Sequence, residues 1–200
     1  MGEIKFTKNE LRDQQKHLAQ LNRYLPTLQL KKAMLQQEVH QARIEIAQST
    51  EFYEKKRGEV QHFSPLFSLK SSVDPDEAAK VSLVKKRYEN IAGVEIPYFD
   101  AVEFEPLEYS LFDTPVWFES AVKGLQKLAE AKVRLEVAKE KKAALEEELR
   151  QVSIRVNLFE KILIPRAKKN IKKIKVFLGD QELAAVSRAK VAKTLIERSR

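Results

Sequence analysis

Two long segments of this sequence carry apolar side chains in a narrow stripe that repeats every 3.5 residues, and this repeat constrains the fold most. Two heptad rows in the first segment are apolar at ten of thirteen positions, and two rows in the second at ten of eleven. Such a stripe is typical of a coiled-coil seam. The predicted seam residues of the first segment are Leu11, Leu18, Leu21, Leu25, Leu28, Leu35, Val39 and Ile46. Those of the second segment are Leu128, Leu135, Leu145, Leu149, Val152, Val156, Phe159 and Leu163.

The first segment has clear signals at both ends. Thr7 and Glu10 have the spacing of a capping box, in which the hydroxyl accepts a backbone N–H and the glutamate reaches back to the cap. Gly58 is the expected end of this helix. Pro26 lies inside it and is expected to kink it, because proline lacks the N–H of a regular turn.

The second segment is expected to begin at Thr114, with Pro115 at the first helical position. Near Pro165 its apolar stripe shifts in phase, which predicts a local change of supercoil. The helix is expected to end at Gly179, with residues 180–200 either forming a short basic amphipathic helix or staying loose.

The region between the two segments differs from them in composition. Residues 81–84 and 94–99 are rich in branched and aromatic side chains, and residues 90–93 between them end in a glycine. This pattern predicts a β-hairpin, for which Asn90, Gly93 and Pro97 are the predicted turn residues. Residues 70–80 are expected to form a loop.

These segments predict a mostly α fold, in which two long helices pair antiparallel around a small region with the hairpin. Antiparallel pairing buries both stripes within one chain, whereas a parallel dimer would leave the connecting region splayed. The pairing is expected to place Thr7 opposite residues near 165, with the second helix extending past the first. The predicted divisions are an N-terminal helix, a central region, a C-terminal helix and a basic tail, at residues 1–58, 59–113, 114–179 and 180–200.

The charge of the chain is unevenly distributed. The net charge is +8, yet residues 161–200 hold 12 Lys and Arg against 3 acids. Residues 88–122 contain no Lys or Arg. The basic end is either a solvated helix face or a surface for an acidic protein or a nucleic acid.

No constellation of residues indicates catalysis. The chain has no cysteine, its histidines (His17, His40 and His62) are widely spaced, and its five glycines form no phosphate-binding loop. We therefore expect no catalytic residue, no metal site and no cofactor. No apolar stretch is long enough to span a bilayer, and the charged N-terminus does not look like a signal peptide, so a soluble intracellular chain is expected.

Several strings of residues resemble a known family, the D subunits of the V-type and archaeal-type rotary ATPases, and the likeness covers nearly the whole chain. They are Arg-Val-Asn-Leu-Phe-Glu at residues 155–160, Ile-Pro-Arg at 164–166, Ile-Lys-Lys-Ile at 171–174, Asn-Ile-Ala-Gly-Val-Glu-Ile-Pro at 90–97, and Thr-Lys at 7–8 with Leu-Gln-Leu-Lys-Lys at 28–32. One departure from the family is the proline at position 26, near which relatives commonly have glycine. The longer central loop suggests a bacterial member.

The resemblance implies a non-catalytic central-stalk rotor subunit of a V-type ATP synthase. Such a subunit couples ATP synthesis or hydrolysis to proton or sodium transport by rotating inside a ring of A and B subunits, which hold the nucleotides. Further implied partners are the F subunit and the subunit that caps the membrane rotor ring. The implied location is cytoplasmic and peripheral, on the inner face of the membrane, with no membrane insertion. The side chains expected to face the ring are Lys161, Arg166, Lys168, Lys169, Lys172, Lys173, Lys175, Arg188 and Lys190.

An alternative from the residues alone is a coiled-coil scaffold, or an adaptor that binds nucleic acid through its basic end. Aromatic side chains for base stacking are scarce there, with Phe177 the only one after Phe159, which weakens this alternative.

Overall fold

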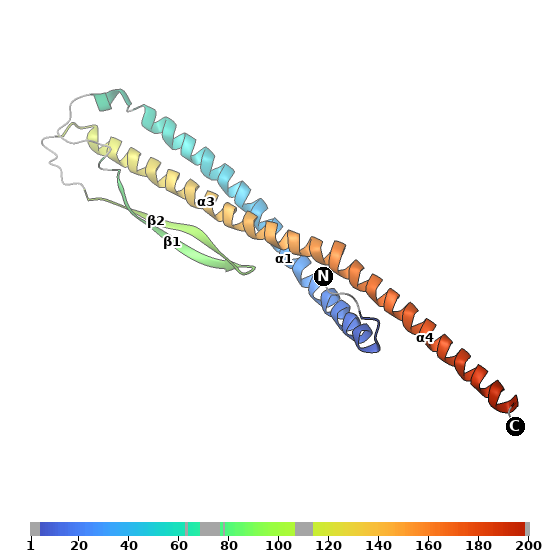
Figure 1. Cartoon of the computed structure of the whole chain (residues 1–200). Coiled ribbons are helices and arrows are strands. Elements are labelled where there is room, and N and C mark those ends of the chain that lie inside the picture. The colour runs from blue at the N-terminus through green and yellow to red at the C-terminus, as the bar shows by residue number, and fades with distance from the viewer. Residues whose placement is uncertain (1–4, 63, 69–76, 78, 107–113, 199–200) are drawn as a thin grey trace. The chain divides into compact units, whose positions relative to one another are not determined.

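The computed structural model describes residues 5–62, 64–68, 77, 79–106 and 114–198 of the chain. Two long helical stretches are joined by a small region that contains an antiparallel two-stranded hairpin, so the predicted fold class is confirmed (Figure 1). The chain divides into two compact units, one made of residues 1–32 and 151–200 and the other of residues 33–150.

The described helices and strands follow one another in a simple order. They are α1 (Lys8–Gln61), the 3-10 turn η1 (Ser64–Ser68), β1 (Val81–Ile91), β2 (Val94–Phe104), α3 (Phe118–Leu158), the π-helical turn η2 (Phe159–Leu163) and α4 (Ile164–Arg198).

Helix α1 begins as predicted but ends later. The Glu10 N–H donates to Thr7 Oγ1 at 3.2 Å, whereas Glu10 Oε1 accepts a hydrogen bond from Gln14 rather than from the cap. The helix runs through Pro26 and ends at Gln61, so the predicted end at Gly58 is wrong. Gly58 costs only about 1 kcal/mol relative to alanine inside a helix, which the hydrogen bonds of the following turn offset.

The second helical stretch also begins and ends later than predicted. A turn precedes α3, in which the Phe118 N–H donates to the Pro115 carbonyl at 2.9 Å, so the predicted start at Thr114 is wrong. Phe118 is completely buried, and its burial favours a helix that begins there. The predicted end at Gly179 is wrong as well, because α4 continues to Arg198. Of the two possibilities for residues 180–198, the helical one is observed, as an extension of α4.

The phase shift near Pro165 is accommodated by η2. A π-helical turn holds one residue more than an α-helical turn, and here the Ile164 N–H donates to the Phe159 carbonyl. Buried positions accordingly move by one residue, so that the heptad row of Val156 continues at Ile164 and Ile171 instead of at Leu163. The structure therefore absorbs the shift in one widened turn.

The helices pair antiparallel within each unit. In the unit of residues 33–150, Arg43 contacts Glu146 and Glu45 contacts Lys141, both from α1 to α3. In the other unit, Lys8 contacts Glu182 and Gln29 contacts Glu160. Within each unit, a higher residue number on α1 thus pairs with a lower residue number on the second helical stretch, which is the pattern of antiparallel helices.

The predicted register of this pairing is wrong by about four helical turns. Residues at the start of α1 lie opposite the middle of α4, since the rings of Phe6 and Phe177 are 5.0 Å apart and Lys8 pairs with Glu182. The prediction assumed that the first helix ends, near residue 58, at the level where the second begins, near residue 115. Instead, Gly124 lies beside Val60 near the end of α1, so the first residues of α3 extend beyond it. The residues after Glu182, not those after 165, therefore extend past the start of α1.

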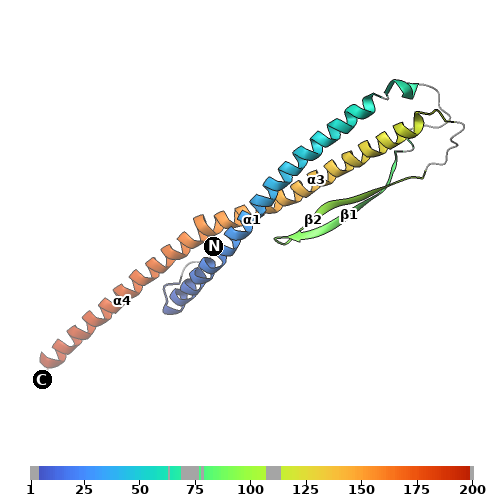
Figure 2. The ribbon, with the colours of Figure 1, turned by 180° about the vertical axis from the view of Figure 1, so that it is seen from behind.

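The hairpin is longer than predicted, with strands of 11 residues each. Its two-residue loop has positive φ at both positions, Ala92 at 52° and Gly93 at 81°, and the Gly93 N–H donates to Asn90 Oδ1 at 2.9 Å. Pro97 lies in β2 opposite Tyr88, beyond the turn. The hairpin lies along α3 in both views (Figures 1 and 2). Most of the loop predicted at residues 70–80 lies outside the described residues.

Candidate functional site

All sixteen predicted seam residues are at least partly covered. The buried ones are Leu21, Leu35, Val39, Leu135, Leu145, Val152 and Val156. The half-buried ones are Leu11, Leu18, Leu25, Leu28, Ile46, Leu128, Leu149, Phe159 and Leu163. Leu35 and Leu145 have no exposed surface at all. The two units therefore each contain a thin apolar interior between two helices.

Among the described residues of the unit of residues 33–150, one charged side chain is buried. Lys141 of α3 has 5% of its side chain exposed, and its Nζ lies 3.0 Å from Glu45 Oε2 of α1. The same Nζ lies 4.0 Å from the centre of the Tyr98 ring of β2. Next to it on α3, Glu140 pairs with Lys86 of β1. We call this group the hairpin clamp, because it ties both strands and α1 to α3.

The hairpin clamp keeps Lys141 charged. Burial by itself lowers the pKa of Lys141, but its hydrogen bonds to Glu45 and Tyr98 outweigh burial and raise the pKa above the ordinary value of 10.5. A cation held against an aromatic face away from water is stabilised by about 2 kcal/mol. Within the clamp, the Lys141 ammonium is therefore shielded from water, whereas its partner Glu45 keeps 37% of its side chain exposed.

The heptad rows did not reveal Lys141, because they place the next residue, Lys142, in the seam. Lys142 is instead half-exposed, and its Nζ lies 3.6 Å from Glu146 Oε1. The sequence does contain a signal for a second covered flank of α3: Val133 and Val137 are apolar although they lie outside both heptad rows. Val137 is buried and Val133 is partly covered, on the flank of α3 that also carries Lys141.

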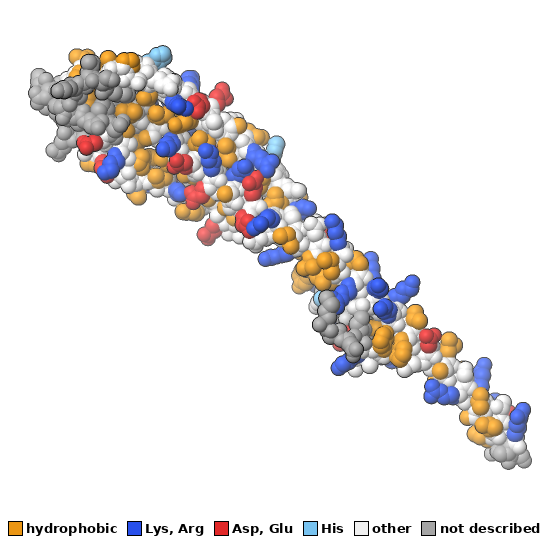
Figure 3. Space-filling view, turned by 45° about the horizontal axis from the view of Figure 1, so that its top comes forward, with side chains coloured by type: hydrophobic (Ala, Val, Ile, Leu, Met, Phe, Trp, Pro, Cys, Tyr) orange, Lys and Arg blue, Asp and Glu red, His pale blue; other side chains and the backbone are white. Residues whose placement is uncertain are grey.

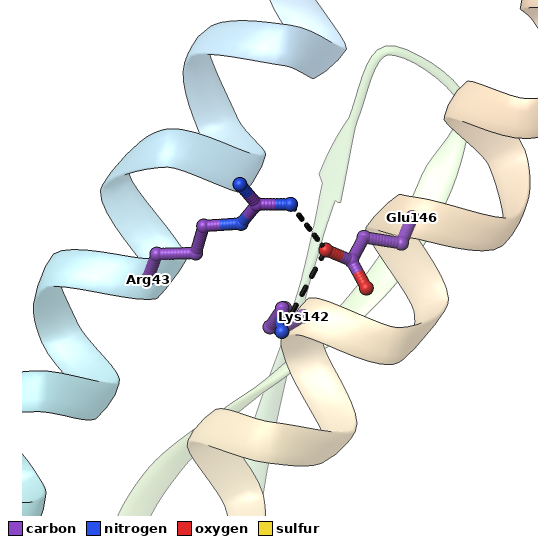
Figure 4. A network of polar contacts seen from close by, with 3 residues as sticks. All are labelled: Arg43, Lys142 and Glu146. Atoms are coloured by element: carbon purple, nitrogen blue, oxygen red, sulfur yellow. Dashed lines mark hydrogen bonds and ion pairs between the residues drawn. The ribbon is translucent and has the colours of Figure 1, made fainter.

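Glu146 also joins α3 to α1 at the surface. It accepts a hydrogen bond from Arg43 at 2.9 Å while contacting Lys142 (Figure 4). The hydrogen bond from Arg43 holds the pKa of Glu146 below its ordinary value. Because these side chains are substantially exposed, such contacts contribute only about 0–1 kcal/mol each.

The nine basic side chains expected to face a partner, from Lys161 to Lys190, are all exposed. Within the part of the chain that the structure describes, none of them forms an ion pair. Figure 3 shows blue side chains spaced along α4 with few red ones between them. Beyond Glu182, α4 also exposes more than half of each of Leu183, Val191 and Leu195. This end of α4 thus exposes both charged and apolar side chains.

Among the described residues, no group of three or more His, Asp or Glu side chains is placed to hold a metal ion. None of the described helices combines the length and the apolar character needed to cross a membrane.

Comparison with known proteins decides the family. The sequence model that describes the D subunits of ATP synthases matches residues 10–194, which include the hairpin and nearly all of the helical residues. The chain belongs to the family of ATP synthase D subunits. It is 46% identical to the V-type ATP synthase D subunit of Chlamydia felis (strain Fe/C-56) over 197 residues, which are 98% of this chain and 95% of that protein.

Other V-type ATP synthase D subunits are similar to the same extent. That of Chlamydia caviae is 45% identical over 98% of this chain and 95% of its own length, and that of Chlamydia trachomatis serovar L2 is 44% identical over 98% and 97%. These relatives are bacterial, and the resemblance seen in the sequence strings is confirmed.

Proposed function

We propose that this chain is the central-stalk rotor subunit of a V-type ATP synthase, and that it couples the nucleotide sites of the complex to ion transport by rotating. The observation that carries the proposal is the identity of 46% to a V-type ATP synthase D subunit over almost the full length of both chains. In this role the chain transmits torque and catalyses no reaction itself.

The packing of the helices supports a mechanical role. A single helix bends easily, whereas two antiparallel helices that pack along a seam resist bending and twisting. Leu35 and Leu145 are fully buried in one unit, and Leu21 and Val156 are buried in the other. A two-helix shaft also has no threefold symmetry, so it presents different faces to three surrounding sites and can bias them toward different states.

The exposed basic face of α4 supports a sliding contact with a ring of A and B subunits. Ion pairs between exposed side chains are individually weak, about 0–1 kcal/mol, so a surface made of many of them exchanges partners as it turns. In this proposal the shaft comprises α1 together with α3 and α4, and the residues of α4 after Glu182 extend past the start of α1 within the ring.

The other end of the chain supplies the remaining contacts in the proposal. Residues 59–113, with their acidic and aromatic composition, contact the F subunit and the subunit that caps the membrane rotor ring. As part of this complex, the chain lies on the cytoplasmic side of the membrane and does not insert into it.

Reconstitution tests the proposal. The purified chain is mixed with A, B and F subunits, and native mass spectrometry measures the assemblies. We expect one copy of the chain per ring of A and B subunits, and no nucleotide bound by the chain alone. Absence of the chain from every ring-containing assembly refutes the proposal. If the chain does not bind the ring but binds DNA with an affinity that falls steeply as the salt concentration rises, the nucleic-acid adaptor is favoured.

A further inference from the structure

Two irregular turns lie opposite each other in the helix pair of residues 1–32 and 151–200. Pro26 lies inside α1, and the π-helical turn η2 lies between α3 and α4. Gln29 donates a hydrogen bond to Glu160, so these two positions face each other. Because the helices are antiparallel, Pro26, which precedes Gln29, faces the end of η2, which follows Glu160. Both helices are therefore interrupted at the same level.

Each interruption removes part of the regular helix hydrogen bonding. Pro26 has no N–H, so the carbonyl of Asn22 loses its usual donor in the next turn. In the second stretch, Pro165 likewise cannot donate to Lys161, and the turn before it is widened. Sharp kinks in helices occur mainly at prolines and π turns. A regular helix alongside could support one such turn, but here neither helix is regular at this level.

The apolar interior of this unit is interrupted at the same level. On the second stretch, buried side chains occur before η2, at Val152 and Val156, and after it, between Ile164 and Ile174. In η2 itself, all of which the structure describes, no residue is buried. The facing residues of α1, 26–30, are described completely and include no buried residue either. Interrupted hydrogen bonds and few buried apolar contacts are together typical of a segment with low local stability.

We infer that residues 22–30 of α1 and 159–165 of the second stretch form a weak joint, in which facing turns of both helices open together while the neighbouring turns stay closed. Leu28, Phe159 and Leu163 are half-buried and hold the two helices in contact when the joint is closed. The joint is a property of the chain by itself. Its consequence rests on the proposed function, because in a rotor the shaft yields first at this joint when torque is applied.

Hydrogen exchange of the free, full-length chain measures this opening segment by segment. In the unchanged chain, the amides of both halves of the joint should exchange at least about tenfold faster than those of residues 151–158 and 167–174. These two reference segments lie on the same helical stretch and contain buried seam residues.

Pro26→Ala tests whether the two halves open together. It restores a donor for the carbonyl of Asn22, so the exchange of residues 22–30 should slow by about tenfold or more. The exchange of residues 159–165 should slow as well, although that half of the joint is unchanged. Thr27→Ala is the matched control, because Thr27 is exposed and adjacent, and its replacement adds no backbone N–H. Both halves should then stay within about threefold of the unchanged chain.

A second variant approaches the joint from the other helix. Pro165→Ala adds a backbone N–H beside η2, and it should slow the exchange of residues 22–30 on α1 as well as that of residues 159–165. If neither proline replacement slows the opposite half, the two helices open independently and the inference is wrong.

Two other results would overturn the joint. One is exchange of residues 22–30 and 159–165 in the unchanged chain that is no faster than in the reference segments. The other is equal slowing of every segment in Pro26→Ala, the hairpin included, which would show that Pro26 lowers only the global stability. None of these measurements uses the ring. Failure of the chain to assemble with A and B subunits therefore contradicts the proposed function and leaves the joint standing, whereas loss of the joint leaves the proposed function standing.

Discussion

Replacing Lys141 by alanine tests how the hairpin is held against the helices. A two-stranded hairpin is at best marginally stable alone in water, so the protection of β1 and β2 depends on their contact with α3. Lys141 supplies part of that contact, because its Nζ lies 4.0 Å from the centre of the Tyr98 ring, and Glu45 of α1 holds the same Nζ at 3.0 Å. Its removal should therefore loosen the hairpin more than it loosens the helix pair.

The expected magnitude follows from the burial of each group. The contact between the Lys141 ammonium and the Tyr98 ring is shielded from water and contributes about 2 kcal/mol. Breaking a fully buried ion pair costs about 3–5 kcal/mol, but Glu45 keeps 37% of its side chain exposed, so its lost partner costs roughly 1 kcal/mol. Relief of the desolvation of Lys141 offsets part of this loss. We expect hairpin opening to become easier by about 2–3 kcal/mol, which corresponds to roughly 30–150-fold faster exchange of its amides.

Hydrogen exchange followed by mass spectrometry measures this effect segment by segment. Peptides from β1 and β2 should exchange faster in Lys141→Ala, while peptides from the middle of α1 and α3 change little. Lys139→Ala, at an exposed lysine two residues earlier on α3, is the matched control and should leave the hairpin protected.

Two results would refute this reasoning. One is hairpin exchange that differs by less than about threefold between the two variants. The other is a uniform increase over hairpin and helices, which would show that Lys141 stabilises the whole unit and not the docking of the hairpin. A double-mutant cycle with Tyr98→Leu provides a further check, since the two changes should be non-additive by about 1 kcal/mol or more.

Three further predictions concern the seam, the pH dependence and the π turn. Leu145→Ala should lower the free energy of unfolding by about 2–5 kcal/mol in urea denaturation, and by clearly more than Leu149→Ala, because Leu145 is fully buried and Leu149 is not. The pKa of Lys141 is raised in the folded chain, so its contribution to stability should be constant below pH 10.5 and fall as the pH rises further; an equal decline in Lys141→Met would contradict this. Deleting Lys161 inside η2 should lower the thermal stability far less than deleting Lys168, which is also exposed. The first deletion removes the extra residue of the π turn, whereas the second rotates every later seam residue by about 100° around the helix. Circular dichroism and thermal melting of the two deletions decide the last prediction.

The two helices, their pairing and the hairpin were predictable because each depends on a repeating or local pattern. A stripe such as Leu21, Leu28 and Leu35 identifies the buried face of a helix wherever the helix lies. The Asn90–Gly93 turn fixes the hairpin through its own positive φ angles. The seam residues are accordingly the part of the candidate site for which sequence reasoning was most informative.

The helix ends and the register were less predictable because they depend on competition between weak local signals and distant packing. Gly58 and Gly179 are good stop signals, yet neither adopts the positive φ of a helix cap here, and both helices continue. The register was inferred from assumed helix ends, so an error there moved the expected partners of α1. The position of Gly124 beside Val60 corrects it, and no local pattern contains that information.

The hairpin clamp and η2 show two different reasons why side-chain roles escaped prediction. Lys141 is buried only because a third element, the hairpin, covers α3 on a face that the heptad rows leave open. The phase shift before Ile164, by contrast, was visible in the sequence but compatible with either an altered supercoil or an inserted residue. Pro165 favours the inserted residue, because it has no N–H to donate to the carbonyl of Lys161 and its ring crowds that carbonyl in a regular α-turn. A widened turn at Phe159–Leu163 relieves this conflict and returns Ile164, Ile171 and Ile174 to the seam in one step.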